Sequence, residues 1–220
     1  MKFIKGIPLT ILAILTMTSA GQSFAATHVF ADLNHSAASS QIQVLQEKRI
    51  VKGVSDQCFA PETQLTAAEG VQLIVNALKL NIDHVRFIKE PLASDYFKKA
   101  NNEAWYADAF IIAAINGLEL PADLDPAEFW TKEEFTYQLI SAMEKHNKLP
   151  MIKLLPVAIG DEKELTPSYQ GAIQRALHYG IASLDEKGNF HPQDHITRED
   201  AAILIYNALK YLDNQPESGN

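Results

Sequence analysis

Apolar residues recur with helical spacing after three threonines, Thr66, Thr131 and Thr197. They stand at offsets of 4 or 5, 7 or 8, and 11 or 12 residues, which is the period of an amphipathic helix. The pattern predicts three helices of about twelve to fifteen residues each. A second helix is predicted before each of these, in the segments SSQIQVLQEKRIV, AWYADAFIIAAINGL and SYQGAIQRALHYGI.

Each of the three threonines is followed three residues later by an acid: Glu69, Glu134 or Asp200. This spacing is typical of a capping box. The threonine hydroxyl accepts from an unpaired N–H of the first turn, and the acid reaches back to the N–H of the threonine. The carboxylate also suits the positive end of the helix dipole. The pattern therefore indicates where three helices begin.

Glycines end two of the preceding helices. Gly117 and Gly180 stand where a left-handed C-cap is expected, because glycine adopts a positive φ without steric cost. Arg49 takes this place in the first segment, so that helix end is expected to be capped less well. The packing face of the second such helix is predicted to comprise Trp105, Phe110, Ile111 and Ala114.

The helix pairs belong to an internal repeat with spacings of 65 and 66 residues between the threonines. An apolar residue stands seven positions before each threonine and a proline five positions before it. These residues are Phe59, Leu124 and Phe190, and Pro61, Pro126 and Pro192. One such repeat is too small to bury its own apolar face, so the three are expected to form one all-α unit.

The N-terminal residues have the pattern of a secretory signal peptide. Lys2 and Lys5 precede an apolar run that begins at Ile7, and Ser23-x-Ala25 suits a cleavage site. The alternative, an uncleaved membrane anchor, is disfavoured because the apolar run is short for a membrane span. We expect a signal peptide over residues 1–25, a secreted mature chain and no membrane span within it.

The charge balance narrows the range of partners. The chain has 19 basic and 27 acidic residues, a net charge of −8. Loss of Lys2 and Lys5 with the signal leaves 17 against 27, or −10. Such a surface argues against nucleic acid and anionic lipid as general partners, so an anionic ligand needs a local cationic pocket. The single cysteine, Cys58, excludes an internal disulfide and is expected to be a loop residue.

The segment YGIASLDEKGNFHPQDHITREDAAILIYNAL resembles a near-complete S-layer homology (SLH) module. The segments FADLNH and VKGVSDQCFAPETQLTAAEGVQLIVNAL resemble the same family, and the middle repeat is the most divergent. The resemblance implies three tandem modules that form a pseudo-threefold spindle around a central three-helix bundle. Their expected bounds are 26–82, 93–147 and 157–212, with irregular linkers over 80–103 and 147–167 and a disordered tail over 213–220.

The resemblance also implies a function, which is non-covalent anchoring to the bacterial cell envelope. In many members of the family the ligand is an anionic secondary cell-wall polysaccharide that bears pyruvate ketals. The cation after the threonine holds its acid groups, and a tryptophan and the Asp of an opening Phe-x-Asp help to form the site. In this chain the implied ligand-binding residues are Arg198, Lys132, Trp105, Asp32 and Asp161.

No single repeat carries the full set of these residues. The cation position holds Arg198, Lys132 and Ala67 in the three repeats. The tryptophan position holds Trp105 in the second repeat, but Ala37 and Ser168 in the others. A complete groove therefore has to combine Arg198 with an aromatic residue of another repeat. We expect one good site, a weaker second site through Lys132, and none that depends on Ala67.

Two other classes of function are considered. The modules could have lost the polymer and kept the spindle as a docking surface for other surface proteins. His191 and His195, with Asp194 between them, could instead bind a metal for hydrolysis, but Pro192 places both in a loop. No nucleophile or nucleotide-binding motif is present. We therefore predict a binding protein of the cell wall or S-layer, with no catalytic residue, metal ligand or cofactor.

Overall fold

The computed structural model describes residues 30–34, 36–147, 149 and 155–215. Within these ranges the chain is helical and forms no strand, so the all-α prediction is confirmed. The α-helices are α1 (Ser39–Glu47), α2 (Ala67–Ala77), α3 (Ala107–Ile115), α4 (Lys132–Asn147), α5 (Gln170–His178) and α6 (Arg198–Asp213). The short 3-10 helices are η1 (Ala31–Leu33), η2 (Ala93–Asp95) and η3 (Glu162–Glu164).

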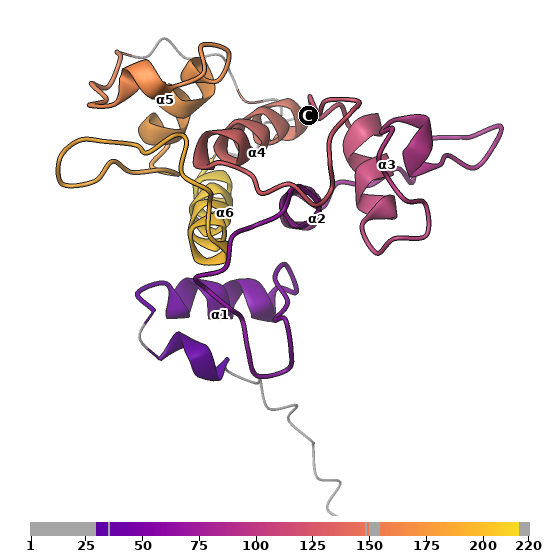
Figure 1. The fold of residues 1–220 in the computed structure, drawn as a ribbon, viewed down its shortest axis with the longest axis horizontal. Coiled ribbons are helices and arrows are strands. Elements are labelled where there is room, and N and C mark those ends of the chain that lie inside the picture. The colour runs from indigo at the N-terminus through magenta and orange to yellow at the C-terminus, as the bar shows by residue number, and fades with distance from the viewer. Residues whose placement is uncertain (1–29, 35, 148, 150–154, 216–220) are drawn as a thin grey trace, which may run out of the picture.

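The helices that follow the three threonines form the centre of the molecule. Helices α2, α4 and α6 pack against one another in pairs, as the predicted three-helix bundle requires. The preceding helices lie outside the bundle and form three lobes around it (Figure 1). Each of them packs on the central helix of the neighbouring repeat: α1 on α6, α3 on α2 and α5 on α4. Each repeat thus depends on another repeat to cover its apolar face.

A ring of backbone hydrogen bonds joins the three repeats just before the central helices begin. The N–H of Leu65 donates to the carbonyl of Ile196 (2.9 Å), Ile196 donates to Trp130 (3.0 Å), and Trp130 donates to Leu65 (3.0 Å). These residues directly precede the three threonines, so the ring follows the pseudo-threefold symmetry. It fixes the order of the repeats around the bundle and thereby decides which residues share each groove.

Two of the three predicted capping boxes are complete, and the third is present only in part. The hydroxyl of Thr66 accepts from the N–H of Glu69, whose carboxylate accepts from the N–H of Thr66. Thr131 and Glu134 make the same pair of hydrogen bonds. In α6 the hydroxyl of Thr197 accepts from the N–H of the shorter acid at position 200.

In the core, a small residue, Gly70, makes room for a large one, Trp130. Trp130 is 2% exposed, and its ring lies against Gly70 of α2. A Cβ atom at Gly70 would stand 2.5 Å from the Trp130 ring. The corresponding positions of the other two central helices hold Phe135 and Ala201, both buried. The bundle therefore accommodates unequal side chains at one level.

Two sequence expectations need correction. Trp105 does not belong to the packing face of α3, because it lies two residues before that helix and is 64% exposed. Phe110 and Ile111 are buried as predicted. The linkers are not wholly irregular, since η2 and η3 form within them. Arg49 takes the left-handed conformation of Gly117 and Gly180, with φ of 59°.

The predicted signal peptide lies outside the described residues, and most of the predicted disordered tail does too. Helix α6 continues to Asp213, so the start of that tail is helical. Where the structure describes the chain, no helix is both long and apolar enough to cross a membrane.

Candidate ligand groove

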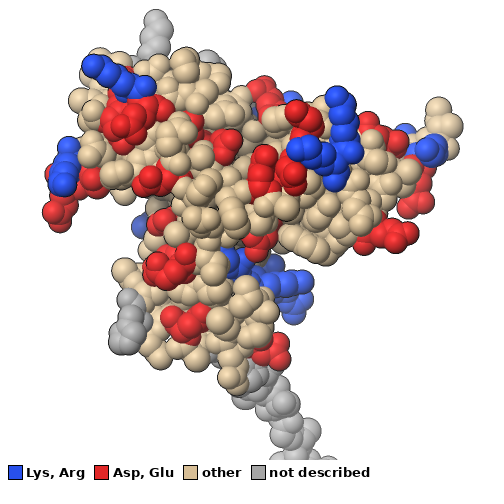
Figure 2. Space-filling model, viewed as in Figure 1, with Lys and Arg blue, Asp and Glu red and all other residues tan. Residues whose placement is uncertain are grey.

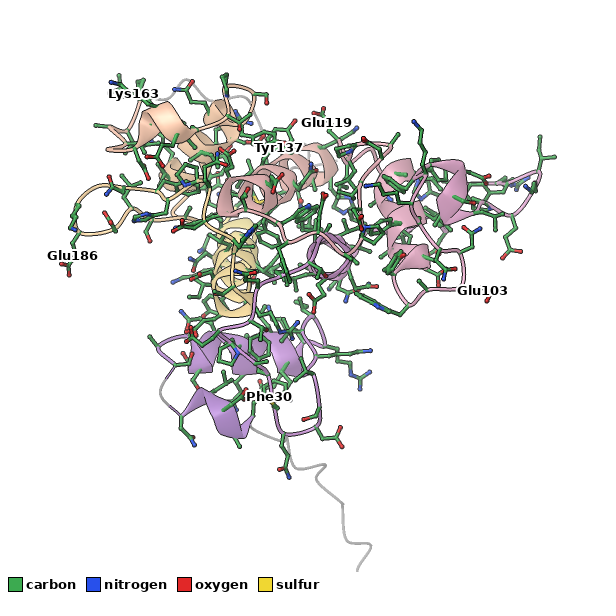
Figure 3. The ribbon with its side chains drawn as sticks, viewed as in Figure 1. Phe30, Glu103, Glu119, Tyr137, Lys163 and Glu186 are labelled. Carbon is green, nitrogen blue, oxygen red and sulfur yellow. The ribbon has the colours of Figure 1, made fainter. Side chains whose placement is uncertain are left out.

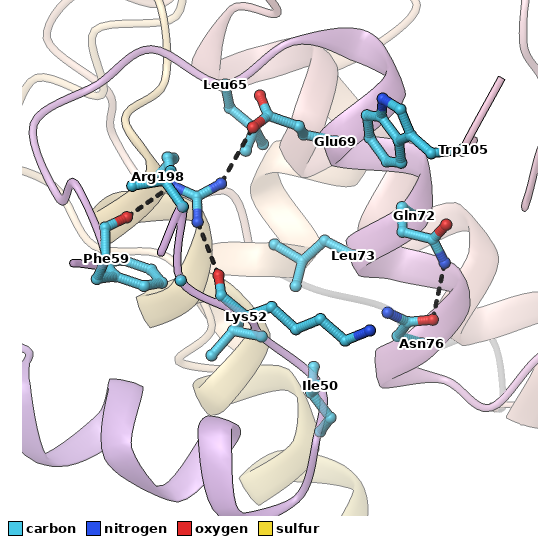
Figure 4. A pocket seen from close by; sticks show the side chains of 13 residues that line it. Ile50, Lys52, Phe59, Leu65, Glu69, Gln72, Leu73, Asn76, Trp105 and Arg198 are labelled. Atoms are coloured by element: carbon cyan, nitrogen blue, oxygen red, sulfur yellow. Dashed lines mark hydrogen bonds and ion pairs between the residues drawn. The ribbon is translucent and has the colours of Figure 1, made fainter. Parts of the chain in front are cut away.

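A groove of about 470 Å³ lies where all three repeats meet (Figure 4). Repeat one contributes the loop after α1, with Lys52 and Gly53, and the exposed side of α2. Repeat two contributes Trp105, and repeat three contributes Arg198. We call this cavity the Arg198 groove. The structure therefore brings together two of the five sequence-predicted site residues, Arg198 and Trp105, from different repeats.

Arg198 is held on several sides. Its Nε donates to the carbonyl of Phe59 (3.0 Å), and one terminal nitrogen donates to the carbonyl of Lys52 (3.0 Å). The other terminal nitrogen forms an ion pair with Glu69 (3.1 Å). The side chain is only 13% exposed. Three of the five N–H donors of a guanidinium are thus engaged within the protein, and the positive charge is balanced by Glu69.

Lys52 supplies a second cation that the sequence reasoning did not identify. Its side chain extends along the groove toward Asn76, as Figure 4 shows. It is exposed and forms no ion pair with any described residue. No repeat-based signal could have found Lys52, because the corresponding position holds Leu120 in repeat two and Ser183 in repeat three.

Trp105 forms one wall of the groove. Its ring packs edge-on against Tyr106, with 5.6 Å between the centroids, and it leaves most of its surface exposed. A large exposed indole beside polar side chains is a common feature of binding sites. The groove also contains the side-chain amides of Gln72 and Asn76, which hydrogen bond to each other at 2.9 Å. These groups offer an apolar face, amide donors and a cation to one ligand.

Asp32 does not line the Arg198 groove, but it stabilises the loop that carries Phe59, which does line it. Its carboxylate accepts from the N–H of Phe59 (3.0 Å) and of Ala60 (2.7 Å), and from the thiol of Cys58 (3.1 Å). Burial opposes the ionisation of Asp32, but these hydrogen bonds outweigh it and keep the pKa of the carboxyl below its usual range. Ala60 needs this support because its φ is 59°. Asp32 therefore positions Phe59, which in turn contacts Arg198.

Asp161 and Lys132 repeat this arrangement elsewhere. The carboxylate of Asp161 accepts from the N–H of Phe190 (2.8 Å) and of His191 (2.7 Å). The ammonium of Lys132 lies 4.8 Å from the centroid of the Phe190 ring. Burial lowers the pKa of Lys132, against the opposing influence of nearby acids such as Asp200.

The Lys132 site lacks the other parts of the groove. The positions that correspond to Trp105 and Lys52 hold Ala37 and Ser183 in this part of the molecule. Ala67 takes the place of Arg198 and Lys132 in repeat one, and its N–H donates to Glu128 of repeat two. In repeat two, Leu124 takes the place of Phe59 and Phe190. The surroundings of Arg198, Lys132 and Ala67 thus differ, and among the described residues only those of Arg198 include both a tryptophan and a second cation.

The two histidines of the metal hypothesis have separate partners. A ring nitrogen of His191 lies 2.9 Å from the carboxylate of Asp185, and the ring of His195 packs edge-on against Phe129. Hydrogen bonds from Asn189 and His191 lower the pKa of Asp185 to about 2. Among the residues that the structure describes, no group of three or more metal-binding side chains converges.

The surface charge agrees with a need for a local cationic site. Figure 2 shows acidic side chains spread over all three lobes of the visible face. Basic side chains form a group beside the α1 lobe, where it meets α2, and smaller areas of basic side chains lie on the other two lobes. The labelled acids Glu103 and Glu186 lie toward the outer ends of two lobes (Figure 3). An anionic ligand would therefore meet an acidic surface except near such a basic region.

Residues 159–202, which include α5 and the start of α6, match the family described as the S-layer homology domain. The chain is 27% identical to exoglucanase XynX of Acetivibrio thermocellus over 188 residues, which cover 84% of this chain and 16% of that protein. It is 26% identical to an amylopullulanase of Thermoanaerobacterium thermosulfurigenes over 84% of this chain and 10% of the relative. It is 23% identical to the surface-layer 125 kDa protein of Lysinibacillus sphaericus over 82% of this chain and 15% of the relative.

The chain thus spans between about a tenth and a sixth of the length of these curated relatives. The match to an S-layer homology domain and the similarity to a surface-layer protein support a cell-surface location and a role in cell-wall anchoring.

Proposed function

We propose that this protein binds non-covalently to an anionic polysaccharide of the bacterial cell wall through the Arg198 groove. One observation carries the proposal: Arg198, Trp105 and Lys52 come from three different repeats and line one groove. A cation, an exposed aromatic ring and side-chain amides together fit a sugar polymer with acidic substituents. The indole packs against the C–H face of a sugar ring, and the ammonium attracts its carboxylate.

The two cations have different tasks in this proposal. Arg198 joins repeat three to the loop and helix of repeat one, and it retains two N–H groups for a ligand acceptor. Lys52 contributes a charge that no acid among the described residues balances by an ion pair. Asp32 acts as a positioning residue through Phe59, and Asp161 acts in the same way for Lys132 at a weaker second site.

The proposal extends the S-layer homology assignment from 159–202 to all three repeats. The support is that the helix pairs, the threonine N-caps and the backbone ring repeat with pseudo-threefold symmetry. We assign the modules to 26–82, 93–147 and 157–212, following a secretory signal over 1–25. The chain acts as a binding module of a secreted surface protein and not as an enzyme.

A sedimentation experiment tests this function. The protein without residues 1–25 is mixed with bacterial wall sacculi and with sacculi from which hydrofluoric acid has removed the polysaccharide. We expect binding only to the first preparation, and a loss of about tenfold for Lys52→Gln, because a charge-assisted contact contributes about 1.5 kcal/mol or more. Lys187→Gln, at an exposed position of repeat three, is the matched control. Equal binding to both preparations would reject the proposal.

The second candidate is a docking module for other surface proteins. The Arg198–Glu69 ion pair favours it, because this pair satisfies inside the protein the charge that the family's ligand would meet. Binding that persists on polysaccharide-free walls and disappears after protease treatment of those walls would select this candidate.

A further inference from the structure

A second hollow adjoins the Arg198 groove on the other side of Trp105. Its volume is about 420 Å³, and its lining includes Arg49, Lys79, Asp108 and Ile112. We call it the Arg49 hollow. It shares Gln72, Asn76 and Trp105 with the Arg198 groove, so the two cavities are neighbours.

Both cations of the Arg49 hollow stand at unusual backbone positions. Arg49 has φ of 59° and Lys79 has φ of 52°, and each directly follows the C-cap of its helix. Glycine is the residue that suits a left-handed helix end, and Gly117 and Gly180 fill the place of Arg49 in the other repeats. Two basic residues therefore occupy positions that favour glycine, and both line the same hollow.

The two cavities together carry an excess of positive charge. Their lining contains four cations and two acids, Glu69 and Asp108. Glu69 is already paired with Arg198. Neither Arg49 nor Lys79 forms an ion pair with any described residue. This excess of positive charge stands out on a chain whose net charge is −8.

We propose that the acidic polymer continues past Trp105 and places a second acidic group in the Arg49 hollow. The site then recognises an oligosaccharide with at least two negative charges, and not a single acidic sugar. The first charge lies near Lys52, a sugar ring packs on Trp105, and the second charge lies between Arg49 and Lys79. This inference rests on the proposed function, since it extends the same site.

The test uses fragments of wall polysaccharide released by hydrofluoric acid, partly hydrolysed and sorted by anion exchange into species with one and with two acidic groups. Calorimetric titration measures their affinities for the parent, for Arg49→Gly/Lys79→Gly, and for Lys163→Gln/Lys187→Gln. The last variant removes two exposed cations from repeat three and is the matched control. Lys163 lies on the outer part of the α5 lobe (Figure 3).

We expect the parent and the control to bind the doubly charged fragment about tenfold more tightly than the singly charged one, as one additional charge-assisted contact implies. Arg49→Gly/Lys79→Gly should bind both fragments equally, with the affinity for the singly charged fragment unchanged. Its melting temperature should not fall, because glycine suits both left-handed positions. The loss of affinity would then not result from misfolding.

Two results would overturn the inference alone: a double glycine variant that keeps the tenfold preference, or a control variant that loses it equally. A parent that binds neither fragment would overturn the proposed function together with the inference. Selective loss of binding in Lys52→Gln, with no effect of the glycine variant on either fragment, would leave the proposed function standing and reject the second subsite.

Discussion

The guanidinium carbon of Arg198 lies 4.8 Å from the centroid of the Phe59 ring, although 139 positions separate the two residues in the chain. Lys132 lies at the same distance from the ring of Phe190. In both cases the cation at the start of a central helix covers the aromatic residue of the next repeat. At the third place the cation and the ring are replaced by Ala67 and Leu124. The cation and the aromatic residue are therefore present or absent together.

Arg198→Ala should lower both stability and wall binding. The change removes three hydrogen bonds and leaves the carboxylate of Glu69, 29% exposed, without its cation. We expect a loss of about 2 kcal/mol in the free energy of unfolding, as for other hydrogen bonds of charged groups. Lys52→Gln should reduce binding with little change in stability. Urea unfolding distinguishes the two variants. Equal stability of Arg198→Ala and the parent would contradict the role of Arg198 in joining repeat three to repeat one.

Gly70→Ala should destabilise the protein although alanine is the better helix former. The new Cβ would stand 2.5 Å from the buried ring of Trp130, and such overpacking costs about 1–3 kcal/mol. The gain in helix propensity offsets about 1 kcal/mol of this. Gly171→Ala is the control, because that glycine of α5 is exposed and meets only the flexible end of Arg175. Thermal unfolding should show a lower melting temperature for the first variant and an equal or higher one for the second.

Acid should remove the stabilisation that Asp161 provides. Hydrogen bonds from Phe190 and His191 overcome the effect of burial and keep the pKa of this carboxyl below its usual value. Its contribution is therefore fully present above the unfolded pKa, about 3.9, and is lost as the pH falls through the lower folded pKa. Asp161→Asn should be less stable than the parent at pH 7, and the difference should shrink below about pH 4.

Urea unfolding between pH 7 and pH 3 measures this difference. Asp56→Asn, at an exposed loop position, is the control and should match the parent throughout. A difference for Asp161→Asn that stays constant with pH would show that the carboxylate is not what stabilises the loop.

The thiol of Cys58 should react slowly. Its hydrogen bond to Asp32, together with burial, raises the pKa of the thiol and reduces the thiolate fraction at pH 8. Iodoacetamide should alkylate it more slowly in the folded protein than in guanidinium. Asp32→Asn should accelerate the reaction, because it removes the negative charge beside the sulfur. An unchanged rate in that variant would mean that access, and not the pKa, controls the reactivity.

The repeats and the helix starts could be predicted from the sequence because they are local features. Thr66 and Glu69 are three residues apart, so their capping box is visible in the sequence and is confirmed. Helical periodicity wrongly assigned Trp105 to a packing face, because it does not show that the residue precedes its helix, whereas the family resemblance placed the same residue in the ligand site.

The parts of the groove also escape sequence reasoning, for a different reason. The contact of Arg198 with Glu69 spans 129 positions and depends on the cyclic order of the repeats. Lys52 has no counterpart in the other repeats and becomes noticeable only when the fold places it in one groove with Trp105. The resemblance identified two groove residues, and the packing of the three repeats adds the rest.

The fluorescence of Trp105 tests most directly whether the polysaccharide binds in the Arg198 groove, because this residue lines the groove. Wall polysaccharide released by hydrofluoric acid is titrated into the protein while tryptophan emission and quenching by acrylamide are followed. The exposed indole of Trp105 should shift its emission to shorter wavelength and become protected from acrylamide, whereas the buried Trp130 should not respond. Trp105→Phe should lose the signal. Saturable binding of the polysaccharide without any change at Trp105, or an equal change in Trp105→Phe, would contradict binding in this groove.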